Sequence, residues 1–209
     1  MNIINSLEWR YATKKFDPSK KLSNHQIETL KKAFNLTATS FGLQPIKLIV
    51  IQNKKLREKL VEASYNQRQV TDASHLLILC IENDTTSESI NAYFDLEKKI
   101  RGVEESVISD FRTQLIDTYK NKTIEEKQQS AIYQTYIALG NLMTVCAVEQ
   151  IDSCPLEGFI PSKIDEILNL SSLNLKSVLM LPVGYSAEDG LNELKKVRKP
   201  INETVIELL

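Results

Sequence analysis

Glycine is scarce in this chain of 209 residues, which contains only 6 glycines, about half of the usual share of roughly 7%. No two of them have the spacing of a G-x-G-x-x-G turn or a G-x-x-x-x-G-K-[ST] loop, the backbone cradles that commonly hold nucleotide phosphates. The scarcity excludes a phosphate site built from glycines. If the protein binds a nucleotide or flavin phosphate, side chains must supply much of the contact.

Histidine and cysteine are also few. The chain has 2 histidines and no cysteine pair at metal-ligand spacing, so we expect no metal site of the zinc or non-haem iron type. The 3 cysteines (Cys80, Cys146 and Cys154) lie among apolar residues without a C-x-x-C motif, which favours buried thiols under reducing, cytosolic conditions. His75 opens an apolar run, so a structural role is expected. Hydrolase chemistry has little support, because no serine or cysteine has a nucleophile's sequence context.

Charge of neither sign dominates. Lys and Arg number 26 and Asp and Glu 27, a net charge of -1, so no global field recruits nucleic acid or an acidic membrane surface. Charged residues from Glu8 onward leave no apolar stretch for a signal peptide, and a cytoplasmic location is expected. Residues 128–148 carry no charge, but their amides and hydroxyls favour a buried helix over a membrane span.

The chain has 42% hydrophobic residues, enough for one sizeable core, and no linker or repeat, so we expect a single domain over residues 1–209. Helical spacing alternates with short apolar runs, which predicts an α/β or α+β class. The expected helices cover residues 3–7, 23–36, 54–64, 87–121, a long segment after the capping box at 123–126, and 161–168; the expected strands cover 46–51, 76–81, 177–183 and a β-like tail at 204–209.

The long uncharged helix has apolar or small residues on nearly all of its faces. Its main stripe is expected to be Ile132, Tyr136, Leu139, Met143 and Cys146. A helix that is hydrophobic all round is either a central core helix or half of a subunit interface.

Several polar segments have two interpretations each. Arg10 to Lys15 and Lys195 to Lys199 are cationic clusters that could form a phosphate site together, although either one alone is more often a solvated surface. The hydroxyl loop over residues 37–40, the amides over 66–69 and the turn at Glu157-Gly158 could each contact a ligand, although ordinary turns are more common.

These segments occur in the order found in the FMN-dependent nitroreductase family. The chain resembles the oxygen-insensitive bacterial NAD(P)H nitroreductases over essentially its whole length. The matching pieces are Arg10-Tyr-Ala-Thr-Lys14, Ser40-Phe-Gly-Leu-Gln-Pro45, Asn66 through Asp72-Ala-Ser-His75, Gly140-Asn141, Pro155-Leu-Glu-Gly158, Pro182-Val-Gly184 and Lys196-Val-Arg198.

The resemblance implies an α+β, nitroreductase-like three-layer fold, in which helices wrap a central, mainly antiparallel sheet. It also implies an intertwined homodimer with two FMN sites at the subunit interface. The uncharged helix would form the dimer core, and the tail from Thr204 would cross to the partner.

The resemblance also implies site residues. Arg10, Lys196 and Arg198 would clamp the FMN phosphate, and Lys14 and Asn66 would meet the flavin pyrimidine edge. Glu157 and Gly158 would lie near flavin O4 and N5, with the Gly158 N–H donating to N5. The flavin carries the chemistry, so no catalytic side chain is implied, and Lys14, Glu157 and Gly158 tune it. The remaining residues implied at the cofactor are Tyr11, Ala12, Thr13, Ser40, Gln44, Gln69 and Pro155, and those at the substrate are Phe41, Lys14, Asn66 and Gln69.

Two positions depart from the family pattern. Ala12 replaces the usual serine and removes a hydroxyl contact, and Gln69 replaces a frequent lysine near the nicotinamide and substrate. Residues 84–125 match poorly, so the aromatic residue that often lines the substrate pocket has three candidates, Phe111, Ile116 and Tyr119.

The implied activity is an NAD(P)H oxidoreductase that reduces nitroaromatics or quinones by ping-pong hydride transfer through FMN. One alternative is another branch of the flavin superfamily, such as an enone reductase, a reductive dehalogenase or a flavin-fragmenting enzyme. The other is a dimeric flavin-binding module without turnover, which the missing cation at Gln69 mildly favours.

Overall fold

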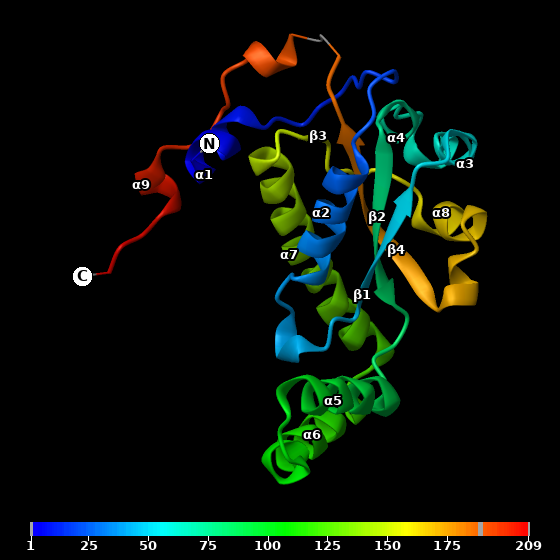
Figure 1. The fold of residues 1–209 in the computed structure, drawn as a ribbon, viewed down its shortest axis with the longest axis vertical. Helices are drawn as coiled ribbons and strands as arrows, with labels where there is room; N and C mark the ends of the chain where they lie inside the picture. The colour runs from blue at the N-terminus through cyan, green and yellow to red at the C-terminus, as the bar shows by residue number, and fades with distance from the viewer. Residues whose placement is uncertain (1, 188–189, 209) are drawn as a thin grey trace.

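The structure is a computed structural model that describes residues 2–187 and 190–208. A four-stranded antiparallel sheet in this described part of the chain has the strand order β1-β2-β4-β3 (Figure 1). Its strands are β1 (Ile46–Ile51), β2 (His75–Glu82), β3 (Asp152–Ser153) and β4 (Leu175–Gly184). The three longer strands confirm the predicted ones, and β3 was not foreseen because two residues carry no recognisable periodicity.

Helices cover both faces of the sheet, which gives three layers (Figure 1). The α+β class and the three-layer arrangement are therefore confirmed. On one face lie α2 (Asn24–Asn35) and α7 (Ile124–Val148), with α1 (Ile3–Trp9) packed on α7, and on the other lie α3 (Lys54–Leu60), α4 (Gln69–Asp72) and α8 (Pro161–Ile167).

The central strand β2 is apolar along almost its whole length because both of its faces are covered. Leu77 and Leu79 pack toward α2 and α7, whereas Leu76 and Ile78 pack in a second core with α3 and α8. Alternate residues of a strand point to opposite faces, so one continuous apolar run serves both cores.

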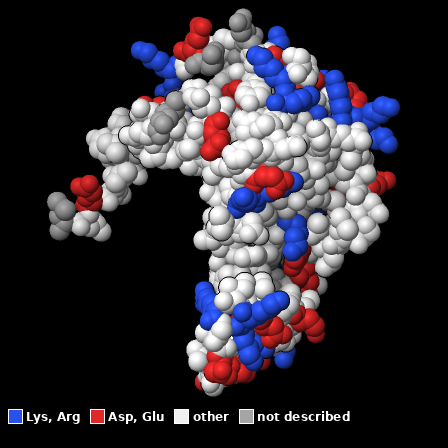
Figure 2. Space-filling view, in the orientation of Figure 1, with Lys and Arg blue, Asp and Glu red and all other residues white. Residues whose placement is uncertain are grey.

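The segment over residues 87–121, predicted as helical throughout, forms two helices, α5 (Ser87–Arg101) and α6 (Glu105–Lys120). Gly102 ends α5 with φ +66°, a left-handed conformation that favours glycine. The two helices pack on each other and project beyond the sheet as an arm, whose surface carries charges of both signs (Figures 1 and 2).

The apolar face predicted for α7 is partly wrong. Ala138, Leu142 and Cys146 are fully buried against the sheet, whereas Tyr136 and Ile137 are exposed. Length and composition alone would let α7 cross a membrane, with a mean hydropathy of 1.3. Its packing against β2 and β4 is that of a core helix with a second, exposed apolar side.

The predicted β-like tail begins differently. Thr204 ends the short helix α9 (Ile201–Thr204), and Val205 is extended. The following residues to Leu208 run away from the body of the protein and pair with no described strand, and Leu209 lies outside the described residues (Figure 1).

His75 lies at the start of β2 and is 5% exposed, with Nδ1 2.9 Å from the Ser74 hydroxyl. Burial, followed by the charges of Arg57, Lys21 and Lys31, lowers the pKa of His75 to about 4. The predicted structural role agrees with this buried, hydrogen-bonded position.

The depressed pKa of His75 makes stability depend on pH. An unfolded histidine titrates near pH 6.5, so between about pH 6.5 and 4 the unfolded chain binds a proton that the folded protein excludes. Stability should therefore fall by about 2 kcal/mol between pH 7 and pH 5 on account of this group. Urea unfolding at both pH values measures the loss, and His75→Gln should remove it. An equal pH dependence in the variant would contradict the assignment.

Candidate active site

The two cationic segments from opposite ends of the sequence meet beside the C-terminal half of α7 (Figure 1). Burial, followed by the nearby charge of Arg198, lowers the pKa of Arg10. Burial, followed by the charges of Arg10 and Arg198, lowers the pKa of Lys196. Arg10 and Lys196 each lie near enough to Arg198 for its charge to act on them, so the three cations form one cluster.

The cationic cluster (Arg10, Lys196 and Arg198) has the donor set of a phosphate site. The Nε of Arg10 is buried without a hydrogen-bond partner, and none of the three cations forms an ion pair within 4.0 Å among the described residues. Gathered like charges repel each other unless an anion lies between them. Guanidinium and ammonium groups suit phosphate oxygens, so the residues present fit the phosphate of FMN.

Lys14 lies four residues after Arg10, on a backbone segment that is hydrogen-bonded to β3. Ala12 bridges Ser153 in parallel, and the Thr13 N–H donates to the Ser153 carbonyl at 3.2 Å. Thr13 is buried with its hydroxyl 3.5 Å from an Asp152 oxygen, so this hydroxyl is not presented to the surface as a cofactor contact. Lys14, the next residue, is exposed.

The turn after β3 presents a free backbone donor. The carbonyl of Gly158 accepts from Gln67 Nε2 at 2.8 Å, while the Gly158 N–H has no partner among the described residues. The Glu157 carboxylate accepts from the Tyr136 hydroxyl at 3.0 Å. A fixed turn with an unused N–H fits the implied hydrogen bond to a ring nitrogen.

The adjacent loop carries the predicted amides. Asn66 is exposed, in a left-handed conformation with φ +60°, one residue before the Gln67 that binds Gly158. Gln69 is the first residue of α4 and only 8% exposed, so little of its side chain reaches the surface of this chain. Tyr11 and Pro155, also implied at the cofactor, are half-buried.

The remaining predicted residues lie on another side of α7. The Ser40 N–H donates to Gln134 Oε1 at 2.9 Å, and Gln134 is two residues from Tyr136, about 200° around the helix. Gln134 is also 12 residues from Cys146, about 18 Å along the helix axis from the cluster of Arg10. One chain therefore does not bring Ser40 to the phosphate cluster.

Phe41 and Phe111 form an exposed aromatic pair in this second group. Their ring centroids are 6.1 Å apart, and Phe111 continues to Phe94 at 5.8 Å. Tyr119 is buried and Ile116 is half-buried against the arm's own core, so Phe111 is the mid-chain candidate that joins the predicted substrate residue Phe41.

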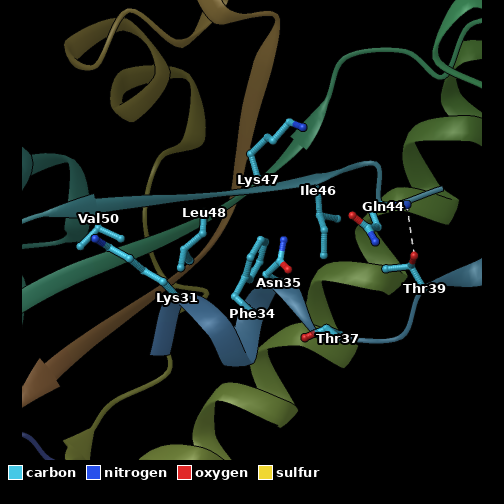
Figure 3. Close-up of a pocket in the computed structure, with 10 residues that line it drawn as sticks. All are labelled: Lys31, Phe34, Asn35, Thr37, Thr39, Gln44, Ile46, Lys47, Leu48 and Val50. Carbon is cyan, nitrogen blue, oxygen red and sulfur yellow. Dashed lines mark hydrogen bonds between the residues drawn. The ribbon is translucent and has the colours of Figure 1, made fainter. Parts of the chain in front are cut away.

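Gln44 lines a cavity of about 310 Å³ between α2 and β1, where its backbone N–H binds the Thr39 hydroxyl at 3.1 Å (Figure 3). Lys31 and Lys47 stand near it, and Phe34 and Leu48 supply apolar walls. The cavity lies along β1, which is an edge strand of the sheet. The outer side of β1 pairs with no described strand.

Two residues with contacts to the site were not foreseen. Tyr136 was placed in the core stripe of its helix, and Cys154 was identified only as a buried thiol. The position of Cys154 directly before the matching piece Pro155-Leu-Glu-Gly158 was the available signal. No group of three metal-binding side chains occurs within the part of the chain that the structure describes.

The sequence model of the Nitroreductase family matches residues 7–185. A protein of Staphylococcus epidermidis named "Putative NAD(P)H nitroreductase" is 35% identical over 196 residues, which cover 90% of this chain and 89% of that protein. A nitroreductase-like protein of Streptococcus mutans has a crystal structure that superposes with a TM-score of 0.85 at 22% identity, covering 99% of this chain and 98% of the other. A "putative nitroreductase in complex with FMN" of Exiguobacterium sibiricum superposes with a TM-score of 0.85 at 18% identity, covering 100% and 98%.

Proposed function

Because the chain belongs to the nitroreductase family, we propose that it is an FMN-dependent NAD(P)H oxidoreductase that reduces nitroaromatics or quinones. The observation that carries this proposal is the cationic cluster, in which Arg10, Lys196 and Arg198 gather without an ion-pair partner within 4.0 Å in the described chain, although Glu8 lies near enough for its charge to act on Lys196. When bound, FMN supplies the ring that accepts hydride from a nicotinamide and gives it to an acceptor.

The protein's own groups bind and orient the cofactor in this proposal. The cationic cluster would hold the phosphate, Lys14 would place a positive charge at the pyrimidine edge, and the Gly158 N–H would donate to the ring. The hydrogen bond from the Tyr136 hydroxyl fixes the Glu157 carboxylate next to Gly158 in the turn. Fixed donors and charges of this kind stabilise charge that develops on a ligand without reorganising.

The proposed cycle is ping-pong. The nicotinamide and the acceptor would use the same position over bound FMN in turn, and this scheme would require no second substrate pocket. Steady-state assays with nitrofurazone, menadione and an α,β-unsaturated ketone test the acceptor class. Parallel lines in double-reciprocal plots for the nitro compound or the quinone are expected, and turnover with the enone alone would assign the chain to another branch.

We propose a homodimer in which the second copy supplies Ser40, Phe41 and Gln44 to the site. The exposed apolar side chains support this, since Ile4 of α1 and Ile137 of α7 are 56% and 51% exposed. Contiguous exposed apolar surface commonly marks an interaction site.

We also propose a cytoplasmic location. All three cysteines are buried free thiols, which supports this location.

The C-terminal tail is the proposed crossing segment. Ile206 and Leu208 are 85% and 94% exposed, while the edge strand β1 has an apolar groove of about 360 Å³ on one side, lined by residues such as Leu56 and Leu168. An extended segment can pair with an open strand edge and place alternate side chains in such a groove.

Deleting residues 201–209 should therefore convert the protein from a dimer to a monomer at micromolar concentration. Light scattering after size exclusion measures the mass, and circular dichroism confirms that the shortened chain folds. A matched variant, Ile124→Ser at the start of α7, removes an exposed apolar side chain that the proposal does not place at the interface, and it should remain dimeric. A truncated protein that stays dimeric would contradict the crossing.

A further inference from the structure

We propose that Cys154 is a positioning residue, whose sulfur directs the Lys14 ammonium toward the pyrimidine edge of bound FMN while leaving its charge intact. The inference rests on the proposed function, because it assigns a role to a contact of Lys14. The contact is direct: Lys14 Nζ lies 3.6 Å from Cys154 Sγ. The Lys14 ammonium has no other hydrogen-bond partner and no ion pair among the described residues.

The backbone holds both residues rigidly. The Cys154 N–H donates to the Pro182 carbonyl of β4 at 3.2 Å. The β-bridge between Ala12 and Ser153 joins the two backbone segments just before Lys14 and Cys154. Cys154 is fully buried and Lys14 is exposed, so their contact lies at the boundary between the core and the surface. A flexible lysine stem is thereby tethered at the end of a fixed strand segment.

Sulfur is a weak hydrogen-bond acceptor, and an ammonium group has three donors, so the contact leaves two N–H groups for a ligand. A carboxylate at this position would neutralise the ammonium. Burial raises the pKa of the Cys154 thiol, against the smaller opposing effect of Lys14, so the sulfur stays uncharged. The arrangement orients a full positive charge, which favours reduced FMN over oxidised FMN because reduction adds negative charge to the ring.

The test measures dissociation constants of oxidised FMN and of dithionite-reduced FMN under anaerobic conditions. Cys154→Val, which removes the acceptor at similar volume, should weaken the reduced form more than the oxidised form by about threefold, equivalent to about 14 mV for a two-electron couple. Cys154→Ser, which keeps an acceptor, should restore the wild-type ratio. If the valine variant does not bind FMN, Cys154→Ala takes its place with the same expected ratio.

An unchanged ratio in the variant without an acceptor, or equal shifts in Cys154→Val and Cys154→Ser, would overturn the inference. Cys80→Val is the matched control, since Cys80 is also fully buried but its sulfur forms no hydrogen bond with a lysine in the described chain, and its ratio should equal that of the wild type. The variant Lys14→Met distinguishes a failure of the role assigned to Cys154 from a failure of the role assigned to Lys14 at the flavin. A shift in Lys14→Met without one in Cys154→Val leaves the proposed function standing, whereas no shift in Lys14→Met removes Lys14 from the flavin.

Discussion

Replacing Arg10 and Arg198 together by alanine is expected to weaken FMN binding by at least about 3 kcal/mol, a factor of more than about 100, because each guanidinium would supply a charge-assisted contact of about 1.5–3 kcal/mol. Arg198→Ala alone should cost one such contact. Arg10 has a buried Nε without a partner and lies near the like charge of Arg198, and both features fit an anionic ligand. Flavin fluorescence during titration of the apoprotein measures both constants.

Arg101→Ala is the matched control for this prediction. Arg101 is an exposed arginine on α5 and pairs with Glu97, outside the cationic cluster. Its loss should leave FMN binding unchanged. An unchanged FMN dissociation constant in the Arg10 and Arg198 double variant would mean that the phosphate lies elsewhere.

Replacing Arg57 by leucine is expected to destabilise the protein by about 3 kcal/mol or more, because several backbone carbonyls would lose a charged hydrogen-bond donor at once. Arg57 is 1% exposed, and its guanidinium donates to the carbonyls of Val70, Ala73, Gln52 and Ser74 at 2.8–3.4 Å. Leucine would leave these acceptors without a donor, and a buried unsatisfied polar group costs about 1–3 kcal/mol.

Arg68→Leu provides the contrast for Arg57. Arg68 is 52% exposed and pairs with Glu58 at 2.7 Å and with Asp72 at 3.4 Å. Exposed ion pairs contribute about 0–1 kcal/mol, so this variant should lie close to the wild type in urea unfolding. Equal losses in Arg57→Leu and Arg68→Leu would show that the carbonyl contacts of Arg57 add little stability.

Helices and strands were predicted well where the sequence signal lies within the element itself, such as a capping box or a short apolar run. The capping boxes at Ser23 and Thr123 are both formed, and β1 has the predicted bounds. The break at Gly102 was missed because charged helical spacing continues on both sides of it. Tyr136 was misplaced because a helix with apolar residues all round does not indicate which face is covered.

The candidate site was harder to predict because its contacts join distant parts of the chain. Arg10 and Arg198 are 188 positions apart, and Lys14 and Cys154 are 140 apart, so spacing alone does not show that they meet. The family resemblance predicted that Arg10, Lys196 and Arg198 lie together, whereas the contact between Lys14 and Cys154 became visible only in the structure. Arg57 had no signal at all, since an arginine among charged helical residues usually lies in solvent.

The absorption spectrum of the FMN-loaded protein before and after anaerobic NADH or NADPH tests the central claim most directly. The account predicts a yellow protein that retains FMN through gel filtration, loses its visible absorbance when the nicotinamide is added, and regains it when a nitroaromatic or quinone follows. A protein that stays colourless after FMN addition, or that stays yellow with both nicotinamides, would contradict it.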